Sequence, residues 1–200
     1  MTAFYREQRH TLATCIFTLI LSVSASFTNA ESKPWTLQKE SSNINFVTIK
    51  NSTIGETHHF TDFSGSIAKG MAKVTIKPDS VSSNIDIRNE RMREFLFETK
   101  MYPTIDITAN VADLIKNIQP GISSQSIAAK LSLHGVTKDI QIQAAVSVIG
   151  NQIRVSSAEA IIISATDFAM GDGIKKLAEL AGVEIVWSVP VNVDLLFTQK

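Results

Sequence analysis

The sequence predicts an all-β fold, an extended antiparallel β-barrel of about eight strands with two short helices. Three observations lead to this prediction. From residue 40 onward, apolar residues alternate with polar or small ones, which is typical of strands with one buried face. Tight turns separate consecutive alternating runs, so neighbouring strands must be antiparallel. Finally, two segments break the period of two and have the spacing of amphipathic helices.

The N-terminal segment has the order of a secretory signal peptide. Arg6 and Arg9 precede the uncharged run 11–25, and small residues lead up to Ala30. We expect cleavage after Ala30, with a site near Ser26 as the alternative. The apolar core of about fifteen residues is shorter than the roughly twenty that a spanning helix needs, and an uncleaved anchor is the other reading.

Residues 31–200 form one predicted domain, a comfortable length for a single core. Without the two arginines and one glutamate of residues 1–30, they contain 17 basic and 18 acidic residues, a net charge of −1. There is no basic stripe for nucleic acid and no polybasic patch for an anionic membrane. The single cysteine, Cys15, falls in the predicted signal peptide, so the mature chain lacks thiols and disulfides, which suits export.

The predicted strands follow from the alternating runs. Odd positions are apolar in residues 127–133, and residues 140–148 repeat the pattern at even positions. The run from Ile185 to Phe197 extends over about thirteen residues, longer than the usual five or six. Shorter runs cover residues 44–46, 74–76 and 105–111. Ile161–Ile163 are three consecutive apolar residues, so alternation does not predict which of them point into the barrel.

Turn residues and a proline mark where these strands end or bend. Gly150-Asn151 and the segment Gly135–Lys138 each connect two alternating runs. Pro190 lies inside the last run, where its missing N–H predicts a local break in the ladder. Short helices are predicted at residues 88–97 and 173–182, the second bounded by glycines. A sandwich of the same strands is the alternative to a closed barrel, which removes the sheet edges.

Several segments share an order and spacing with one known family. Trp35 precedes the serine-initiated strand Ser42–Phe46, and Phe60–Ile67 has an aromatic-x-x-aromatic-x-Gly pattern. Ser80–Pro103 and Leu131–Lys138, which contains Leu-Ser-Leu-His-Gly-Val-Thr-Lys, complete the set. Together these segments resemble the YceI-like family of secreted lipid-binding β-barrel proteins, over essentially all of the chain after the signal peptide.

The chain departs from the family pattern at four positions. Asn89 stands where the family usually has aspartate, and Asp139 stands where a proline is common. Ala165 and Ala169 replace a basic residue and a glycine. These changes leave the fold inference intact, but they put in doubt the carry-over of ligand contacts.

The resemblance implies a lipocalin-like barrel in the bacterial periplasm that holds a long isoprenoid or other amphiphilic lipid in an apolar tunnel. Binding would depend on buried apolar area at about 25 cal/mol per Å², with a few polar groups at a mouth. Aromatic residues are the candidates to line the tunnel, with plain core as the alternative for each: Phe46, Phe60, Phe63, Phe95, Phe97, Tyr102, Phe168 and Trp187.

Two arginines are candidates to contact a lipid head group. Arg88 and Arg91 flank the start of the first predicted helix. The alternative is a solvated helix face on which Glu90 and Glu94 pair with neighbouring arginines.

The sequence carries no pattern for catalysis or metal binding. It has no Gly-x-Ser-x-Gly, His-Glu-x-x-His or phosphate-loop motif. His58 and His59 are adjacent and would face opposite sides of a strand, and His134 belongs to the family-like turn. We therefore expect no enzyme, no metal and no cofactor other than a bound isoprenoid or fatty lipid as ligand.

The predicted function is non-enzymatic binding, transport or storage of such a lipid in the periplasm. The expected partner is a small amphiphilic lipid, with no nucleic acid and no stable membrane insertion after signal cleavage, while a homodimer is left open. The alternative is a filled barrel that acts through its outer surface as an accessory or stress-linked protein of the cell envelope. An enzyme acting on a bound lipid is a third possibility, for which no residue pattern speaks.

Overall fold

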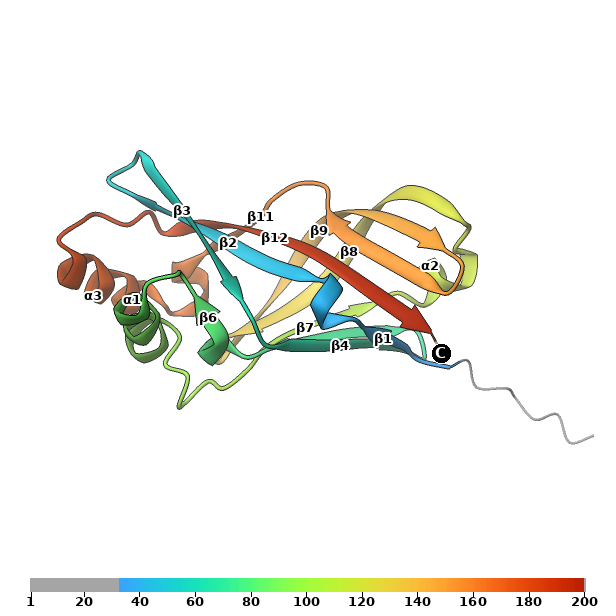
Figure 1. Ribbon diagram of the computed structural model, residues 1–200, viewed down its shortest axis with the longest axis horizontal. Coiled ribbons are helices and arrows are strands. Elements are labelled where there is room, and N and C mark those ends of the chain that lie inside the picture. Colours follow the sequence, from blue (N-terminus) through green and yellow to red (C-terminus); the bar gives the residue numbers. More distant parts are fainter. Residues whose placement is uncertain (1–32, 200) are drawn as a thin grey trace, which may run out of the picture. The chain divides into compact units, whose positions relative to one another are not determined.

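The structure is a computed structural model that describes residues 33–199, so the predicted signal peptide lies outside the described residues. Eight strands pair in the order β1-β4-β5-β7-β8-β9-β10-β12, and β12 pairs again with β1 to close the ring (Figure 1). All these pairings are antiparallel. The prediction of a closed antiparallel barrel is confirmed, and the sandwich alternative is wrong.

The ring contains eight strands of very different length. They are β1 (Trp35–Leu37), β4 (Phe63–Ala68), β5 (Met71–Ile76), β7 (Ile105–Asn110), β8 (Gly121–Leu133), β9 (Val136–Ile149), β10 (Gln152–Ser157) and β12 (Ser188–Gln199). The two longest, β8 and β9, have 13 and 14 residues and form one hairpin. Strands this long follow from the uninterrupted alternation in the sequence.

Four further strands extend the wall beyond the ring. They are β2 (Asn43–Lys50), β3 (Ile54–Phe60), β6 (Val81–Ser82) and β11 (Ile161–Ser164). β2 pairs with β12 next to β1, β3 pairs with β2, and β6 pairs with β3. β11 pairs with the first half of β12, next to β10. The short 3-10 helix η1 (Lys39–Ser41) separates β1 from β2 in the sequence.

The structure shows which side chains of β11 point inward and how the proline in β12 affects the strand pairing. Ile161 and Ile163 face the barrel interior, whereas Ile162 is 61% exposed. The β2 ladder on β12 stops at Val191, immediately after Pro190, and the next bridge is only at Ile185. This is the predicted local break, because proline has no N–H to donate to β2.

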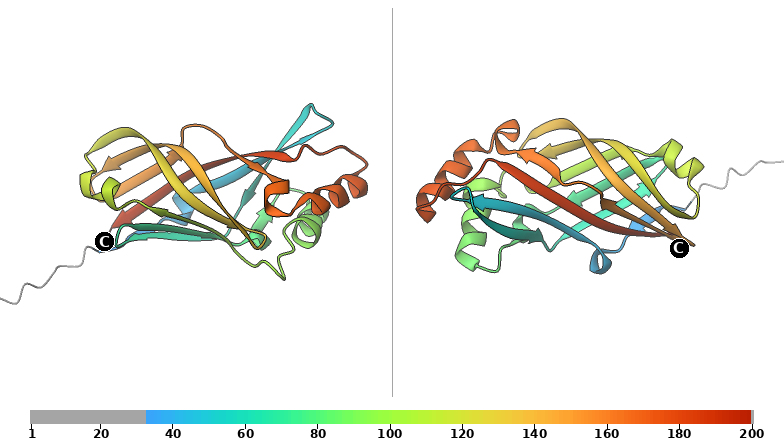
Figure 2. Two further views of the ribbon diagram at one scale, coloured as in Figure 1. Left: turned by 180° about the vertical axis from the view of Figure 1, so that it is seen from behind. Right: turned by 90° about the horizontal axis from the view of Figure 1, so that it is seen from above.

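Two of the helices lie at one end of the barrel and the third at the other (Figure 2). α1 (Asp86–Arg91), which continues into the π-helical turn η3 (Met92–Leu96), and α3 (Gly171–Ala181) confirm the predicted helices. Each begins two residues earlier than predicted. α3 ends at Gly182, whose φ of 65° suits glycine.

α2 (Ala112–Asn117) was not predicted from the sequence. It lies between β7 and β8 at the end opposite α3 (Figure 1). Six residues give too little periodicity to reveal a helix, but Leu114 and Ile115 pack against the core. The 3-10 helices η2 (Pro78–Ser80) and η4 (Ala165–Phe168) complete the elements.

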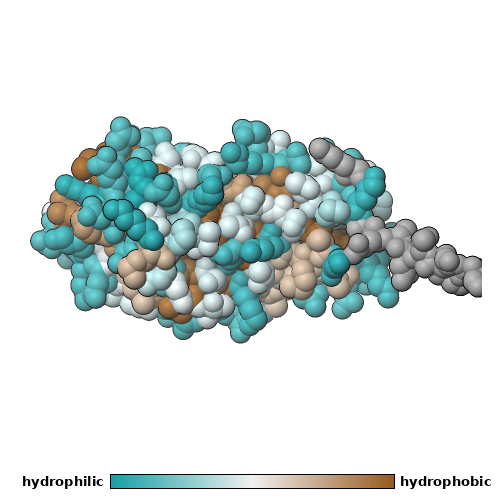
Figure 3. Space-filling view, turned by 90° about the horizontal axis from the view of Figure 1, so that it is seen from below, coloured by the Kyte–Doolittle hydropathy of each residue, from teal (hydrophilic) through white to brown (hydrophobic). Residues whose placement is uncertain are grey.

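Outside the barrel the side chains are mostly polar. On the face shown in Figure 3, hydrophilic side chains surround separate hydrophobic patches. This agrees with the outward positions of the alternating strands. Within residues 33–199, none of the helices has the length and apolar character to cross a bilayer.

Candidate functional site

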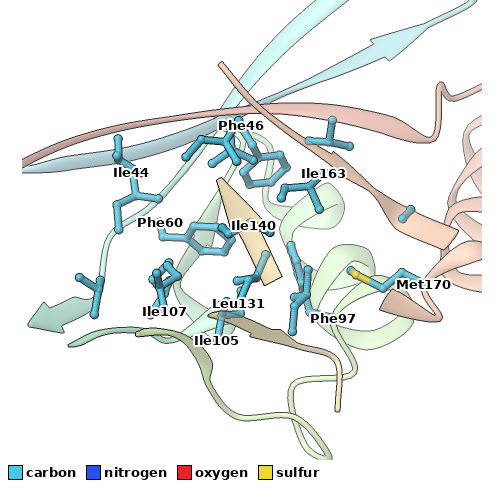
Figure 4. Close-up of a pocket in the computed structure, with 18 of the residues that line it drawn as sticks. Ile44, Phe46, Phe60, Phe97, Ile105, Ile107, Leu131, Ile140, Ile163 and Met170 are labelled. Atoms are coloured by element: carbon cyan, nitrogen blue, oxygen red, sulfur yellow. The ribbon is translucent and has the colours of Figure 1, made fainter. Parts of the chain in front are cut away.

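The barrel interior contains an apolar cavity of about 170 Å³ towards the end covered by α1 and α3. All of the wall surface that faces the cavity is apolar. In Figure 4 the labelled side chains, among them Phe46, Phe60, Ile140 and Met170, converge on this space from several strands and from the η4–α3 segment. We call it the tail cavity.

The tail cavity occupies one half of the barrel interior, and the position of a residue along its strand decides whether it lines the cavity. On β9, Ile140 and Ile142 line the cavity, but the next inward residues, Ala144 and Val146, are fully packed. We therefore distinguish the cavity half from the packed half. The packed half contains Ala109, Ala144, Val146, Val148, Ile153 and Phe197.

Three phenylalanines form one wall of the tail cavity. The ring centroids of Phe46 on β2 and Phe60 on β3 are 5.4 Å apart. The ring of Phe97 stands edge-on to both, with centroid distances of 6.3 Å to Phe46 and 5.7 Å to Phe60. Such aromatic pairs contribute about 0.5–1.5 kcal/mol beyond the area they bury. The wall is therefore held in place by its own contacts.

The helices close the tail cavity at one end. Leu96 from η3 and Ile174 from α3 both line it. α3 approaches η3 so closely that a Cβ at Gly173 would overlap the Phe95 carbonyl oxygen and lie 3.0 Å from Leu96 Cα. Glycine is thus required at this contact. π-helical turns such as η3 frequently occur at functional sites.

A second cavity of about 230 Å³ lies between α1, α3 and the β2–β3 hairpin. It shares three wall residues, Thr48, Leu96 and Ile174, with the tail cavity. Its wall also contains charged and polar side chains. We call it the mouth cavity, lined by Thr48, Lys50, His58, Ile85, Ile87, Arg88, Arg91, Met92, Leu96, Ile174, Leu177, Ala181 and Ile185.

The polar character of the mouth follows from the inward faces of β2 and β3. On β2 the inward series changes from Ile44 and Phe46 to Thr48 and Lys50. On β3 the face of Phe60 continues through His58 to Glu56, and the register sets Phe46 opposite His58 and Thr48 opposite Glu56. The alternation in the sequence therefore already indicated a polar mouth, because these polar residues occupy the same alternate positions along the strands as the buried aromatic residues.

Glu56 holds two cations at the mouth. Its carboxylate forms two contacts with the Arg88 guanidinium, at 2.9 and 3.1 Å, and a short ion pair with Lys50. The hydrogen bond from Lys50 and the charge of Arg88 lower the pKa of Glu56 despite its partial burial. Arg88 therefore pairs with a carboxylate on β3, and the suggested pairing with Glu90 or Glu94 is wrong for this arginine.

Arg91 is bound differently from Arg88. Its Nη1 donates a hydrogen bond of 3.3 Å to the main-chain oxygen of Leu180 in α3. Its positive charge is not neutralised by any carboxylate ion pair within residues 33–199.

His58 is the most deeply buried polar side chain of the mouth, with 1% of its surface exposed. Its Nε2 lies 2.8 Å from the Thr48 hydroxyl, and its ring packs 5.1 Å from Phe46. Burial first, and then the charge of Arg88, lower the pKa of His58 to about 4, so the ring is neutral. Nδ1 has no hydrogen-bond partner among the residues described.

The aromatic candidates named from the sequence fall into two groups. Phe46, Phe60 and Phe97 line the tail cavity. The others do not line either cavity: Phe63 and Phe168 are buried in the core, Phe95 and Tyr102 are half-buried, and Trp187 is 37% exposed under Lys175. Arg88 and Arg91 both line the mouth cavity. That any of them contacts a ligand stays a prediction.

The family-like turn around His134 has a structural role. His134 Nε2 lies 2.6 Å from a Glu98 carboxylate oxygen, and its ring packs against that of Tyr102 at a tilt of 48°, with the ring centroids 4.3 Å apart. Gly135 has a φ of 77°, and a Cβ added at this position would lie only 2.8 Å from the Tyr102 ring. Glycine therefore leaves the room that this ring needs. The turn thus anchors the loop before β7. No group of three or more potential metal ligands occurs in residues 33–199.

The model of the YceI-like domain matches residues 35–197. The chain belongs to the YceI-like family. A solved polyisoprenoid binding domain from Saccharophagus degradans, implicated in plant cell wall breakdown, is 33% identical with a TM-score of 0.79, and the match covers 83% of this chain and 98% of that one. BcnA from Burkholderia cenocepacia shares the fold at 17% identity and a TM-score of 0.64, over 80% and 98% of the two chains. No curated protein matches the chain.

Proposed function

We propose that this YceI-like protein binds one long-chain isoprenoid or other amphiphilic lipid non-enzymatically and carries or stores it in the periplasm. The observation that carries the proposal is the tail cavity, a wholly apolar space inside a closed barrel. Empty apolar cavities remain dry because water finds no polar partners there, and one of about 150 Å³ can bind benzene. A hydrocarbon tail is a suitable occupant.

The energetics of such binding are favourable. Each buried CH₂ group contributes about 0.8 kcal/mol, so ten carbons contribute about 8 kcal/mol before the costs of binding. A tail longer than the cavity would have to pass Leu96 and Ile174 to reach the mouth cavity, because these side chains form walls of both cavities.

Two further observations support the proposal. The solved relative at 33% identity is a polyisoprenoid binding domain, and it aligns over nearly its whole length. The signal-like order of residues 1–30 and the lack of cysteine in residues 31–200 support export to the periplasm.

The decisive experiment is native mass spectrometry of the mature protein purified from the periplasm, followed by solvent extraction of whatever is bound. We expect a stoichiometric lipid, or stoichiometric uptake of an added isoprenoid alcohol such as farnesol. A bare mass that remains unchanged after incubation with farnesol, isoprenoid quinones and fatty acids would contradict lipid binding and favour the surface-acting barrel.

A further inference from the structure

The mouth cavity carries an excess of positive charge. Lys50, Arg88 and Arg91 lie in its wall, and no carboxylate does within the described part of the chain. Glu56, which lies behind Lys50 and Arg88 and pairs with both, offsets one of the three charges. Two positive charges therefore remain. The Lys50 and Arg88 side chains are only 20% and 23% exposed, so solvent screens them less than it screens surface ions.

His58 adds a polar atom that lacks a partner. The ring is almost fully buried, and its Nε2 faces the Thr48 hydroxyl. When that hydroxyl donates to Nε2, the proton of the neutral ring is on Nδ1, which has no acceptor in residues 33–199. A buried donor without an acceptor costs about 1–3 kcal/mol. The ring therefore adds an uncharged polar group to the wall of the mouth cavity, while Nδ1 itself has almost no accessible surface.

The mouth cavity lies where the head of a bound amphiphile must be. Thr48, Leu96 and Ile174 form walls of both cavities, so only these side chains lie between a tail in the apolar cavity and this polar space. Along β2 the side chains change from apolar Ile44 and Phe46 to polar Thr48 and Lys50, in the same order as the tail and the head of an amphiphile.

We propose that the mouth cavity is a site for an anionic head group, a carboxylate or a phosphate, bound by Arg88 and Arg91. Arg91, whose charge has no ion-pair partner within residues 33–199, contributes most of the selectivity for an anion. Arg88 and Lys50 add to the positive potential while they remain paired with Glu56. This inference rests on the proposed function, because the tail of the same molecule must occupy the tail cavity.

The test compares ligands that differ only in the head. Farnesyl phosphate is paired with farnesol, and dodecanoate is paired with dodecanol, in native mass spectrometry titrations at pH 7.5 of the mature protein, its Arg91→Gln variant and its Lys130→Gln variant. Lys130 is an exposed cation on β8, paired with Asp139 and outside both cavities, so its variant is the matched control for loss of one positive charge.

We expect the anionic member of at least one pair to bind at least tenfold more tightly than its alcohol. The ratio should fall to about twofold in Arg91→Gln and stay unchanged in Lys130→Gln. The pair with the larger ratio shows whether phosphate or carboxylate is preferred.

Three other outcomes would overturn the inference. If alcohol and anion bind equally, the head-group site is wrong while lipid binding in the tail cavity stands. If neither the alcohols nor the anions bind, the proposed function fails and the head-group site fails with it. Equal losses in the Arg91→Gln and Lys130→Gln variants would also reject the site, because they would indicate a general effect of net charge.

Discussion

The two halves of the barrel interior are built from the same strands, yet one contains a cavity and the other is fully packed. On β7, Ile105 and Ile107 line the cavity while Ala109 is packed, and β9 shows the same change between Ile142 and Ala144. The cavity half therefore has the larger inward side chains but the less complete packing. Side-chain size does not explain the difference.

The strand pairing does explain it. In the packed half, β9 pairs with β8 on one side and with β10 on the other, from Ala144 to Ile149. Before Ala144, β9 pairs only with β8, because β11 pairs with β12 alone among the described strands. The barrel wall is thus less tightly closed in the cavity half, and helices rather than strand pairs cover its end. A cavity remains where the pairing of β9 with β10 ends.

The largest expected effect comes from matched truncations in the two halves. Ile153→Ala in the packed half, where the side chain is 1% exposed, should lower the free energy of unfolding by about 4 kcal/mol. Ile163→Ala in the cavity wall should cost about 1–2 kcal/mol, since its cavity-facing atoms have fewer contacts to lose. Urea unfolding of both variants measures the difference. Equal losses would show that the cavity half is packed as tightly as the other.

The second effect concerns the pH dependence of stability at the cavity end. His58 has a pKa of about 4 in the folded protein, against 6.5 for an ordinary histidine. Between these values the unfolded chain binds a proton that the folded protein does not, so stability is complete above pH 6.5 and decreases as the pH falls to about 4. We expect a loss of up to about 3 kcal/mol, measured by urea unfolding at pH 7.5 and 4.5.

The control for this prediction is the neighbouring histidine. In His58→Gln most of the decrease should vanish, whereas His59→Gln should retain it. Arg88, Lys50 and His59 all disfavour the charged ring and only Glu56 favours it. Glu56 itself, with a pKa below 4.5, loses its contribution mainly below this window. An unchanged pH profile in His58→Gln would mean that this ring is not held neutral by the fold.

The third prediction tests the helical cover of the cavity half. Gly173→Ala should cost about 2 kcal/mol, because the new methyl group overlaps the main chain of η3 and forces α3 outward. Gly55→Ala is the control, since its Cβ would make an ordinary 3.7 Å contact with Val47. Thermal unfolding compares the two variants. Similar melting temperatures would contradict the tight contact between α3 and η3.

The smallest effect on stability is expected when the cavity is filled. Val193→Phe places a larger side chain in the tail cavity, so it should cost less than about 1 kcal/mol in unfolding free energy while weakening farnesol binding about tenfold. The matched Val146→Phe in the packed half should cost about 2 kcal/mol, because no space is free there. Unchanged farnesol affinity in Val193→Phe would place the ligand elsewhere.

Much of the fold could be predicted because the relevant information is local. Alternation over 127–133 and 140–148 identified the long hairpin, and glycine at position 182 marked the end of α3. The candidate site was predicted less completely. Three of the eight aromatic candidates line the tail cavity. The others do not, because alternation along a strand predicts that a residue points into the barrel but not at which end of the barrel it lies. His58 was considered only as a metal ligand.

The sequence by itself determined an antiparallel barrel with two short helices, its family, and the inward face of nearly every strand, because period two and turn residues act between near neighbours in the chain. Only the tertiary structure decided where the barrel is hollow, that Arg88 pairs with Glu56, and that His58 is buried beside Thr48. These features depend on the register between β2 and β3 and on the approach of α3 to η3. Such contacts join distant segments, and the local pattern of residues does not specify them.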